Sequence, residues 1–327
     1  MVILSFSTIL VSCGEKKTNE VVVYVSVDQV FSEPVLKGFE KKTGIKVLPV
    51  YDVEAAKTTG LVNRLVAEKD YPKADVYWNN EFAQTISLKE KGILDQYKSP
   101  NSSDIPDRFK DLENYWAAIG GRARVLLVNK NLIKPDDYPK TLDDLLNPKY
   151  PADKIGIANP VFGTTATHAA AIYAQIGKDK GYDYFNKLKE RGVCVVDGNS
   201  VVRDMVVSGQ LMMGLTDTDD AGTAIKKGQP VEMVFLDQQE GQMGTLVTPN
   251  TVAKIKNCQH PEEAEKLIDY LLSVETEKEL LKSGWFDLSL RSKDSSSPQV
   301  KSMNLNLNDV YKQLEISKRD MTEIFVR

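Results

Sequence analysis

Three carboxylates lie within four residues in the segment Thr216-Asp217-Thr218-Asp219-Asp220, which directly follows an apolar run. At a separation of about 4 Å and an effective dielectric near 20, each like-charged pair repels by roughly 4 kcal/mol. A positive partner must offset this repulsion, and two kinds are possible. One is the N-terminus of the helix predicted to follow, whose dipole stabilises each acid by ~0.3–1 kcal/mol. The other is a bound cation, either a hard metal ion or the ammonium group of a ligand.

Other polar groups also stand at predicted strand ends or helix starts. Asp28 follows the first predicted strand, and Asn79-Asn80-Glu81 follows another, where helix capping is the alternative to ligand binding. Gly163-Thr164-Thr165 presents backbone N–H groups and hydroxyls at a helix start, which suits an anion or a ligand carboxylate. Arg122 and Arg124 alternate and therefore share one face of their strand, with solvated arginines as the alternative to anion binding.

These groups are positioned by a chain in which apolar strands alternate with helices. Strands are predicted at 21–25, 45–50, 74–78, 125–128, 155–158, 193–196, 211–215, 231–235, 245–248 and 251–255. Helices are predicted from Ser32 to Gly44 and at 61–67, 82–91, 164–176, 200–208, 219–227, 262–273, 276–282 and 310–325. This order predicts an α/β fold with mostly parallel sheets covered by helices, whose ligands lie beyond the carboxyl ends of the strands. Two such units of similar plan predict a two-lobed protein with a cleft.

The composition excludes several functional classes. The 327 residues include 42 Lys and Arg against 46 Asp and Glu, whereas a nucleic-acid-binding groove needs a basic surplus. Two His and three Cys, without a CxxC or HExxH motif, leave little for a soft metal site. Cys194 lies in a predicted strand, where it acts as a small hydrophobe, and a disulfide to Cys258 is not expected. We therefore expect a site built mainly from oxygen-bearing side chains, with no nucleic-acid partner.

The first residues carry information about location. Residues 2–11 form an apolar run that is too short to cross a bilayer, for which ~18 apolar residues are needed, and that is typical of a secretory signal. Leu10-Val11-Ser12-Cys13 matches a bacterial lipobox, in which the cysteine becomes the acylated first residue of the mature protein. Residues 1–20 are therefore interpreted as a lipoprotein signal and tether with lipidation at Cys13, and a frayed apolar N-terminus is the alternative.

Several segments, in this order and spacing, resemble the family 1 extracellular solute-binding proteins of ABC importers and, among them, the ferric-ion-binding branch. The segments include Val22-Val-Val-Tyr-Val-Ser, Ala74-Asp-Val-Tyr-Trp-Asn-Asn-Glu, Gly121-Arg-Ala-Arg-Val-Leu-Leu-Val-Asn and Met243-Gly-Thr-Leu-Val-Thr-Pro-Asn. The resemblance implies a type II periplasmic-binding-protein-like fold whose lobes are hinged by crossing strands, with residues 21–123 plus 246–327 in one lobe and 124–245 in the other. It also implies a non-enzymatic monomer on the outer side of the cytoplasmic membrane that delivers its ligand to an ABC permease.

The ligand implied by the resemblance is a metal ion. Ferric relatives carry adjacent tyrosines after the strand equivalent to 211–215, where this chain has Asp217, Asp219 and Asp220. Glu81 matches the branch's carboxylate ligand, and Gly-Arg-x-Arg resembles a motif whose arginine holds an accompanying anion. The expected cation-binding set is Asp28, Glu81, Asp217, Asp219 and Asp220; the expected anion-binding set is Arg122, Arg124, Thr164 and Thr165; and Trp78 and Asn80 are expected to wall the cleft.

Several functions remain open at this point. A carboxylate site suits an iron(III)-like ion, but it equally suits Ca²⁺, Mn²⁺ or Mg²⁺, or the ammonium group of an amine or aminophosphonate. No catalytic cofactor is expected. A metal-dependent hydrolase is a further alternative, although the sequence offers no GxSxG motif and no clear base. An adhesion or sensor protein on a lipidated scaffold is the third.

Overall fold

The computed structural model describes residues 19–52, 59–284, 287–291 and 300–326. Cys13 and nearly all of the predicted signal and tether lie outside these residues. Within them, none of the helices is both long enough and apolar enough to cross a bilayer.

The helices and strands follow the predicted alternation, with an additional helix at 178–191 and an additional short strand at 94–95 that are not predicted from the sequence. The strands are β1 (Glu20–Val25), β2 (Lys46–Tyr51), β3 (Val76–Asn79), β4 (Leu94–Asp95), β5 (Ala117–Asn129), β6 (Ile155–Ala158), β7 (Cys194–Val196), β8 (Met213–Asp217), β9 (Val231–Val234) and β10 (Val247–Ile255). The helices are α1 (Gln29–Thr43), α2 (Thr59–Ala67), α3 (Ala83–Glu90), α4 (Gly163–Ile176), α5 (Lys178–Arg191), α6 (Asn199–Val207), α7 (Thr218–Lys226), α8 (Pro261–Leu271), α9 (Val274–Ser283) and α10 (Leu307–Val326).

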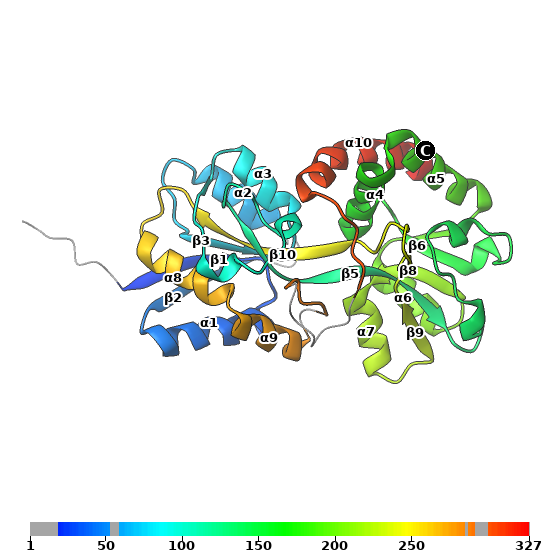
Figure 1. The fold of residues 1–327 in the computed structure, drawn as a ribbon, viewed down its shortest axis with the longest axis horizontal. Coiled ribbons are helices and arrows are strands. Elements are labelled where there is room, and N and C mark those ends of the chain that lie inside the picture. The colour runs from blue at the N-terminus through cyan, green and yellow to red at the C-terminus, as the bar shows by residue number, and fades with distance from the viewer. Residues whose placement is uncertain (1–18, 53–58, 285–286, 292–299, 327) are drawn as a thin grey trace, which may run out of the picture.

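The molecule has two lobes, which lie side by side in Figure 1. In lobe 1 the strand order is β2-β1-β3-β10-β5, with β4 beside β10; in lobe 2 it is β5-β8-β6-β7, with β9 beside β5. The pairs β1–β2, β1–β3, β6–β7 and β6–β8 are parallel, whereas β5 and β10 pair antiparallel to their neighbours. The two-lobed periplasmic-binding-protein-like fold is thus confirmed.

Two long strands, β5 and β10, connect the lobes (Figure 1). The first half of β5 pairs with β10 in lobe 1, and its second half pairs with β8 and β9 in lobe 2. The sequence predicts 245–248 and 251–255 as separate strands, but they form the single strand β10 with a register shift between Pro249 and Asn250. Proline cannot donate a ladder hydrogen bond, which explains why the pairing is irregular there.

Helix α1 begins earlier than the sequence suggests. The predicted N-cap, Ser32, lies inside the helix and donates a hydrogen bond from its hydroxyl to the carbonyl of Asp28, which occupies the N-cap position. Pro34 stands inside the helix as well. The C-terminal end agrees with the prediction, because Gly44 adopts the left-handed conformation (φ 73°) that closes helices.

The C-terminal helix α10 lies against α4 and α5 of lobe 2 and also contacts α3 of lobe 1. Figure 1 shows α10 spanning the space between α3 and α4. Residues 307–326 therefore belong mainly to lobe 2, which differs from their expected place in lobe 1. A long amphipathic helix packs on whichever apolar surface it reaches, and the sequence pattern does not specify that surface.

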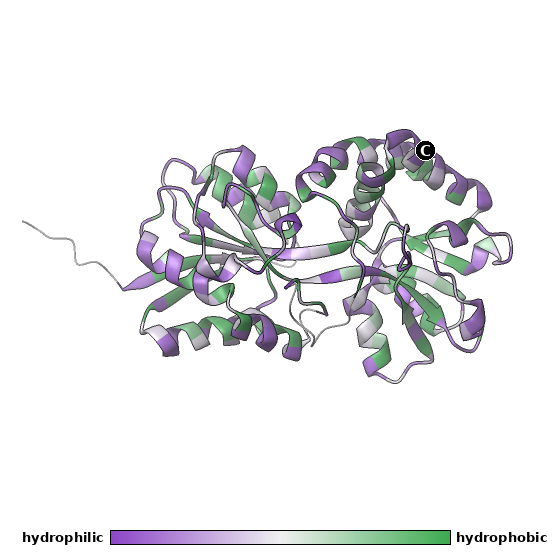
Figure 2. Cartoon of the chain, in the orientation of Figure 1, coloured by the Kyte–Doolittle hydropathy of each residue, from purple (hydrophilic) through white to green (hydrophobic). Residues whose placement is uncertain are grey.

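The apolar core extends through both lobes. The inner strands are almost continuously apolar, as expected for strands covered on both faces, and the outer faces of the helices are hydrophilic (Figure 2). Val125, Leu126, Leu127 and Val128 of β5 are 0% exposed. The crossing strand is thus rigidly packed where it enters lobe 2, directly beside Arg122 and Arg124.

Candidate functional site

A cavity of about 500 Å³ opens between the two lobes. Lobe 1 contributes the residues just before and in the first turn of α3, the crossing strands contribute one residue each, and lobe 2 contributes the start of α4 and one face of α10. The lining residues are Asn80, Glu81, Ala83, Gln84, Arg122, Val161, Phe162, Gly163, Thr164, Ala166, Thr167, Thr248, Leu314, Glu315 and Lys318. Four of the predicted site residues therefore line one cavity: Asn80, Glu81, Arg122 and Thr164.

Behind the cavity wall, Arg124 and Asp217 form a buried ion pair. Arg124 Nη1 lies 2.8 Å from Asp217 Oδ1, and the two side chains are 2% and 7% exposed. Asn199 Nδ2 donates to Asp217 Oδ2 at 2.9 Å, and the Thr164 hydroxyl donates to the same oxygen. Burial alone would raise the pKa of Asp217, but Arg124 and Arg122 outweigh it and hold the pKa below its usual value. Asp217 is therefore an ionised partner of arginine, not a carboxylate open to the cleft.

Arg124 is only partly satisfied by its neighbours. Its Nη1 also donates to Asn199 Oδ1 at 3.0 Å, but its Nε and Nη2 are buried without a hydrogen-bond partner among the described residues. His168 of α4 lies close enough that burial and the charge of Arg124 lower its pKa to about 3. This histidine is therefore neutral and packed in the core. The unpartnered guanidinium N–H groups are positive groups beside Thr164, which lines the cavity.

Arg122 joins the two lobes at the cavity floor. Its Nη1 lies 3.1 Å from Asp219 Oδ2 in lobe 2, and its Nη2 donates to the Asn80 carbonyl of lobe 1 at 3.5 Å. The Nε of Arg122 and Oδ1 of Asp219 are buried and have no partner within the described part of the chain. Because the Arg122 side chain is 16% exposed and lines the cavity, it can contact a ligand directly.

Asp220 is paired with an arginine that the sequence does not single out. Arg203 Nη1 lies 2.8 Å from Asp220 Oδ1, and the Thr216 hydroxyl is 3.5 Å from Oδ2. Burial raises the pKa of Asp220 to about 6, with a further contribution from neighbouring Asp219. The three acids at the start of α7 are thus offset by three arginines, Arg124 for Asp217, Arg122 for Asp219 and Arg203 for Asp220.

Glu81 caps helix α3. Its carboxylate accepts hydrogen bonds from the backbone N–H groups of Ala83 (2.6 Å) and Gln84 (2.8 Å) and from Asn79 Nδ2 (3.2 Å). Burial nevertheless raises the pKa of Glu81, because these hydrogen bonds only partly offset the loss of water. The capping alternative for this segment agrees with the geometry, although Glu81 also lines the cavity.

The start of α4 presents positive backbone groups to the cavity. Gly163 begins the helix at φ 57°, and no side chain caps it from the Phe162 position. The first-turn N–H groups of a helix have no intrahelical acceptors, and they attract anions. Gly163 and Thr164 line the cavity, whereas Thr165 is buried and directs its hydroxyl to Asn199 Oδ1 at 3.3 Å.

Two predicted site residues lie away from the cavity. Trp78, in the middle of the lobe 1 core, is 0% exposed, so it is not the expected cleft wall. The indole is buried because β3 lies between β1 and β10 and is covered on both faces. Asp28 occupies the N-cap position of α1 and is not part of the described lining of the cavity.

The expected cluster of cation ligands does not form among the described residues. There, no group of three or more His, Cys, Asp or Glu side chains is arranged to hold a metal ion. The carboxylates do gather at one edge, as predicted, but arginines and helix N–H groups already bind them. Cys194 and Cys258 are both free thiols.

Some residues of the site could not be singled out from the sequence. Asn199 connects Arg124, Thr164 and Asp217, and it follows β7 as a polar residue at a strand end, which is the signal used for the other loops. Phe162 lines the cavity with 62% of its surface exposed. The residues of α10 at the cavity have no sequence motif that marks them as site residues. They reach the cavity only because α10 packs across the two lobes.

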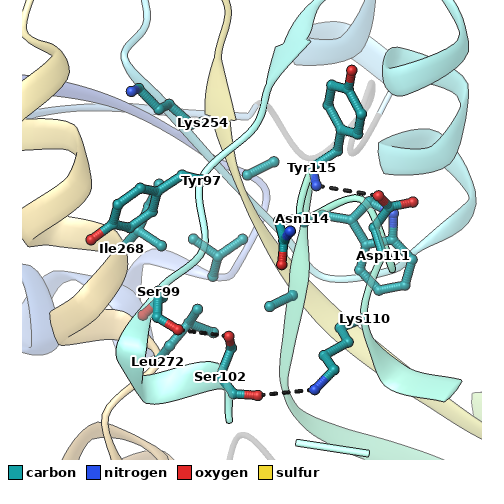
Figure 3. Close-up of a pocket in the computed structure, with 14 residues that line it drawn as sticks. Tyr97, Ser99, Ser102, Lys110, Asp111, Asn114, Tyr115, Lys254, Ile268 and Leu272 are labelled. Atoms are coloured by element: carbon teal, nitrogen blue, oxygen red, sulfur yellow. Dashed lines mark hydrogen bonds between the residues drawn. The ribbon is translucent and has the colours of Figure 1, made fainter. Parts of the chain in front are cut away.

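A second cavity lies within lobe 1, between Tyr97, Lys110 and Lys254 (Figure 3). Its volume is about 20 Å³, which is enough for one water molecule. Its polar groups already bond to one another, since Ser102 donates to the Ser99 carbonyl at 2.7 Å and Lys110 donates to the Ser102 carbonyl at 3.3 Å. This cavity is therefore too small for a solute.

Two named proteins are similar to the chain over most of its length. The "Major ferric iron-binding protein" of Neisseria meningitidis serogroup B is 26% identical over 267 residues, which cover 80% of this chain and 78% of that protein. The "Putative 2-aminoethylphosphonate-binding periplasmic protein" of Salmonella typhimurium is 24% identical over 250 residues, which cover 76% of this chain and 70% of that protein.

The fold is shared with solved structures and the family is shown by sequence. The ferric iron-binding protein A of Mannheimia haemolytica, in an open conformation, superposes with a TM-score of 0.83 at 22% identity, covering 94% of this chain and 98% of that one. The family of bacterial extracellular solute-binding proteins matches residues 35–303. The chain therefore belongs to the bacterial extracellular solute-binding proteins.

Proposed function

We propose that this protein is the extracytoplasmic receptor of an ABC importer and that it binds a small solute through an oxyanion group in the interlobe cavity. The observation that carries the proposal is the convergence of Arg122 and the uncapped start of α4 on one cavity of about 500 Å³. Behind them, Arg124 holds two buried N–H groups without a partner among the described residues. Arginine N–H groups and helix N-termini are the groups that bind phosphate and carboxylate oxygens.

Three of the acids near the cavity already have partners. Asp217 and Asp219 pair with Arg124 and Arg122, and Glu81 accepts hydrogen bonds from the backbone N–H groups at the start of α3. A bare cation would compete with these partners, and at the buried Arg124–Asp217 pair the removal of one member costs about 3–5 kcal/mol. An oxyanion at the start of α4 needs no such displacement, because the first-turn N–H groups of a helix have no intrahelical acceptors.

A ferric ion carried with an accompanying anion is the second candidate. The Neisseria relative is named for ferric iron, and Glu81 lies in the cavity lining where a carboxylate could contact such an ion. In this alternative the anion occupies the same N–H groups, and the metal lies between the anion and Glu81. Both candidates share an oxyanion on Arg122 and α4.

Selection follows from closure of the lobes. A solute that contacts Arg122, lobe 1 and the start of α4 stabilises the closed arrangement more than the open one, and only that difference shifts the population. The solute is released unchanged to an ABC permease. We further propose that lipidation at Cys13 anchors the receptor to the outer face of the cytoplasmic membrane. We also propose that the receptor is a monomer.

Native mass spectrometry of the purified protein, before and after treatment with an iron chelator, separates the two candidates. An organic oxyanion predicts an added mass that survives chelation, and a ferric complex predicts an added mass that chelation removes. Calorimetric titration of the emptied protein with inorganic phosphate, sn-glycerol 3-phosphate and ferric citrate then ranks the cargo. The proposal is wrong if none of these probes binds.

A further inference from the structure

Helix α10 forms one wall of the interlobe cavity. We infer that Lys318 on this wall is a further ligand-binding residue and that the cargo is therefore an organic oxyanion with at least two negative charges, such as a phosphate ester. This inference rests on the proposed oxyanion-binding function. The inference gives α10 a role in ligand binding, although no sequence motif points to this helix.

The position of α10 is fixed by contacts on both sides. In lobe 2, the buried Asp320 accepts a hydrogen bond from the Tyr173 hydroxyl at 3.4 Å, and Phe325 packs edge-on against Phe185. Toward lobe 1, the hydroxyl of Tyr311 interacts with Ser87 on α3. Between these anchors, Leu314, Glu315 and Lys318 face the cavity.

Lys318 brings a third positive element to the cavity. It is exposed, and its side chain forms no salt bridge or hydrogen bond with the described residues. Arg122 and the start of α4 line the same cavity. Lys312, one and a half turns away on α10, differs in that it pairs with Asp309 at 3.1 Å and does not line the cavity.

Two acids, Glu81 and Glu315, line the same cavity as Lys318. Glu81 is held by the N–H groups at the start of α3, and burial raises its pKa. Glu315 stands one turn before Lys318 and has basic side chains three or four residues away on the helix at Lys312, Lys318 and Arg319. Lys318, Arg122 and the N–H groups at the start of α4 line one cavity and can contact the same oxyanion, and a group with two negative charges gains more from these contacts than a group with one.

The size and the apolar wall of the cavity indicate an organic cargo. At about 30 Å³ per water molecule, a cavity of about 500 Å³ is far larger than one inorganic oxyanion requires. Phe162 lines it with 62% exposure, and Leu314 stands partly buried on α10. A carbon skeleton lying between these side chains removes their apolar surface from water, which stabilises the complex.

The test is a set of calorimetric titrations with sn-glycerol 3-phosphate, glycerate and inorganic phosphate. The first two probes share a three-carbon skeleton and differ in whether the anionic group carries two charges or one. Wild-type protein is expected to bind glycerol phosphate at least tenfold more tightly than either other probe. Lys318→Gln is expected to weaken glycerol phosphate binding at least tenfold and to reduce its advantage over glycerate, and Lys318→Arg is expected to restore both.

Lys312→Gln removes the same charge from the same helix outside the cavity and is expected to change each affinity by less than threefold. The inference is overturned if Lys318→Gln binds all three probes as the wild type does, or if wild-type protein prefers glycerate. If wild-type protein binds inorganic phosphate but neither organic probe, the oxyanion site stands and the organic cargo is wrong. If it binds none of the probes, the proposed function itself fails.

Discussion

Arg124 on β5 and Asp217 on β8 are direct partners in the antiparallel register of the lobe 2 sheet, and their side chains form an ion pair at 2.8 Å. The pair is almost fully buried, with 2% and 7% of the side-chain surfaces exposed. It fixes the strand that links the lobes to the strand that carries the acidic loop. The arginine therefore has a defined position beside Thr164 at the cavity wall.

Substituting Asp217→Asn is expected to destabilise the fold. The change leaves the Arg124 charge buried without a counter-charge, and loss of one partner of a buried pair costs about 3–5 kcal/mol. Urea unfolding at pH 7 measures this effect. Asp204→Asn removes an exposed carboxylate that pairs with Arg203 at the surface, and it is expected to cost less than ~1 kcal/mol. Equal stabilities for the two variants would show that the Arg124–Asp217 pair does not support the fold.

Substituting Asp220→Asn is expected to stabilise the protein at neutral pH. Burial raises the pKa of Asp220 to about 6 in the folded state, whereas an unfolded aspartate releases its proton near pH 4. Between these values the folded state binds more protons, so the free energy of unfolding falls as the pH rises. The asparagine side chain does not titrate, so the variant keeps the stability that the wild type loses as the pH rises. Its free energy of unfolding at pH 7 should therefore be about 1–3 kcal/mol higher than that of the wild type.

The same variant provides its own control at low pH. At pH 4 the wild-type carboxyl is protonated in the folded state, so the two proteins should then unfold at similar urea concentrations. A difference in stability that is the same at pH 4 and pH 7 would mean that Asp220 does not titrate in this interval.

Gly121 allows the crossing strands to approach each other. A Cβ atom at this position would lie 2.9 Å from Val247 Cγ1 and 3.2 Å from the Thr248 carbonyl oxygen. Because the second atom is backbone, Gly121→Ala must shift β10, and overpacking of this kind costs about 1–3 kcal/mol. The lower stability of Gly121→Ala can be measured as a lower midpoint of thermal unfolding.

Gly222→Ala is the matched variant for this prediction. Gly222 lies within α7, where the added methyl group would approach no described residue other than Asp287, whose Oδ1 would lie 3.9 Å away. Alanine is favoured over glycine in helices by about 0.8–1.0 kcal/mol, so this variant should be more stable than the wild type. If both glycine variants have the same stability, the close approach at Gly121 does not limit the connection between the lobes.

The local elements of the fold were predictable because they depend on neighbours in the sequence. The apolar run Val125-Leu-Leu-Val128 and the closing glycine Gly44 each specify an element without reference to the rest of the chain. The placement of α10 was not predictable. It depends on contacts with α4, α5 and α3, which are distant in the sequence.

The candidate site was predictable in position but not in its pairings. Glu81 and Thr164 reach one cavity because each follows a strand with a parallel neighbour, β3 and β6, and Arg122 reaches it from the crossing strand β5. The pairing of Asp217 with Arg124 depends on the register between β5 and β8, which a strand pattern does not reveal. The strand pattern therefore presents Asp217, Asp219 and Asp220 as open ligands, whereas an arginine pairs with each of them. Trp78 is expected at the cavity wall, but all four residues of β3 are buried and the indole lies in the core.

The most direct test of the central claim is the affinity of the Arg122→Gln variant for sn-glycerol 3-phosphate, measured by calorimetry beside the wild type and Arg203→Gln. Arg122 lines the cavity, whereas Arg203 carries the same charge toward Asp220 outside the lining. A lost charge-assisted hydrogen bond of about 1.5–3 kcal/mol predicts at least a tenfold weaker complex for Arg122→Gln and less than a threefold change for Arg203→Gln. Wild-type affinity in Arg122→Gln would contradict an oxyanion site between the lobes.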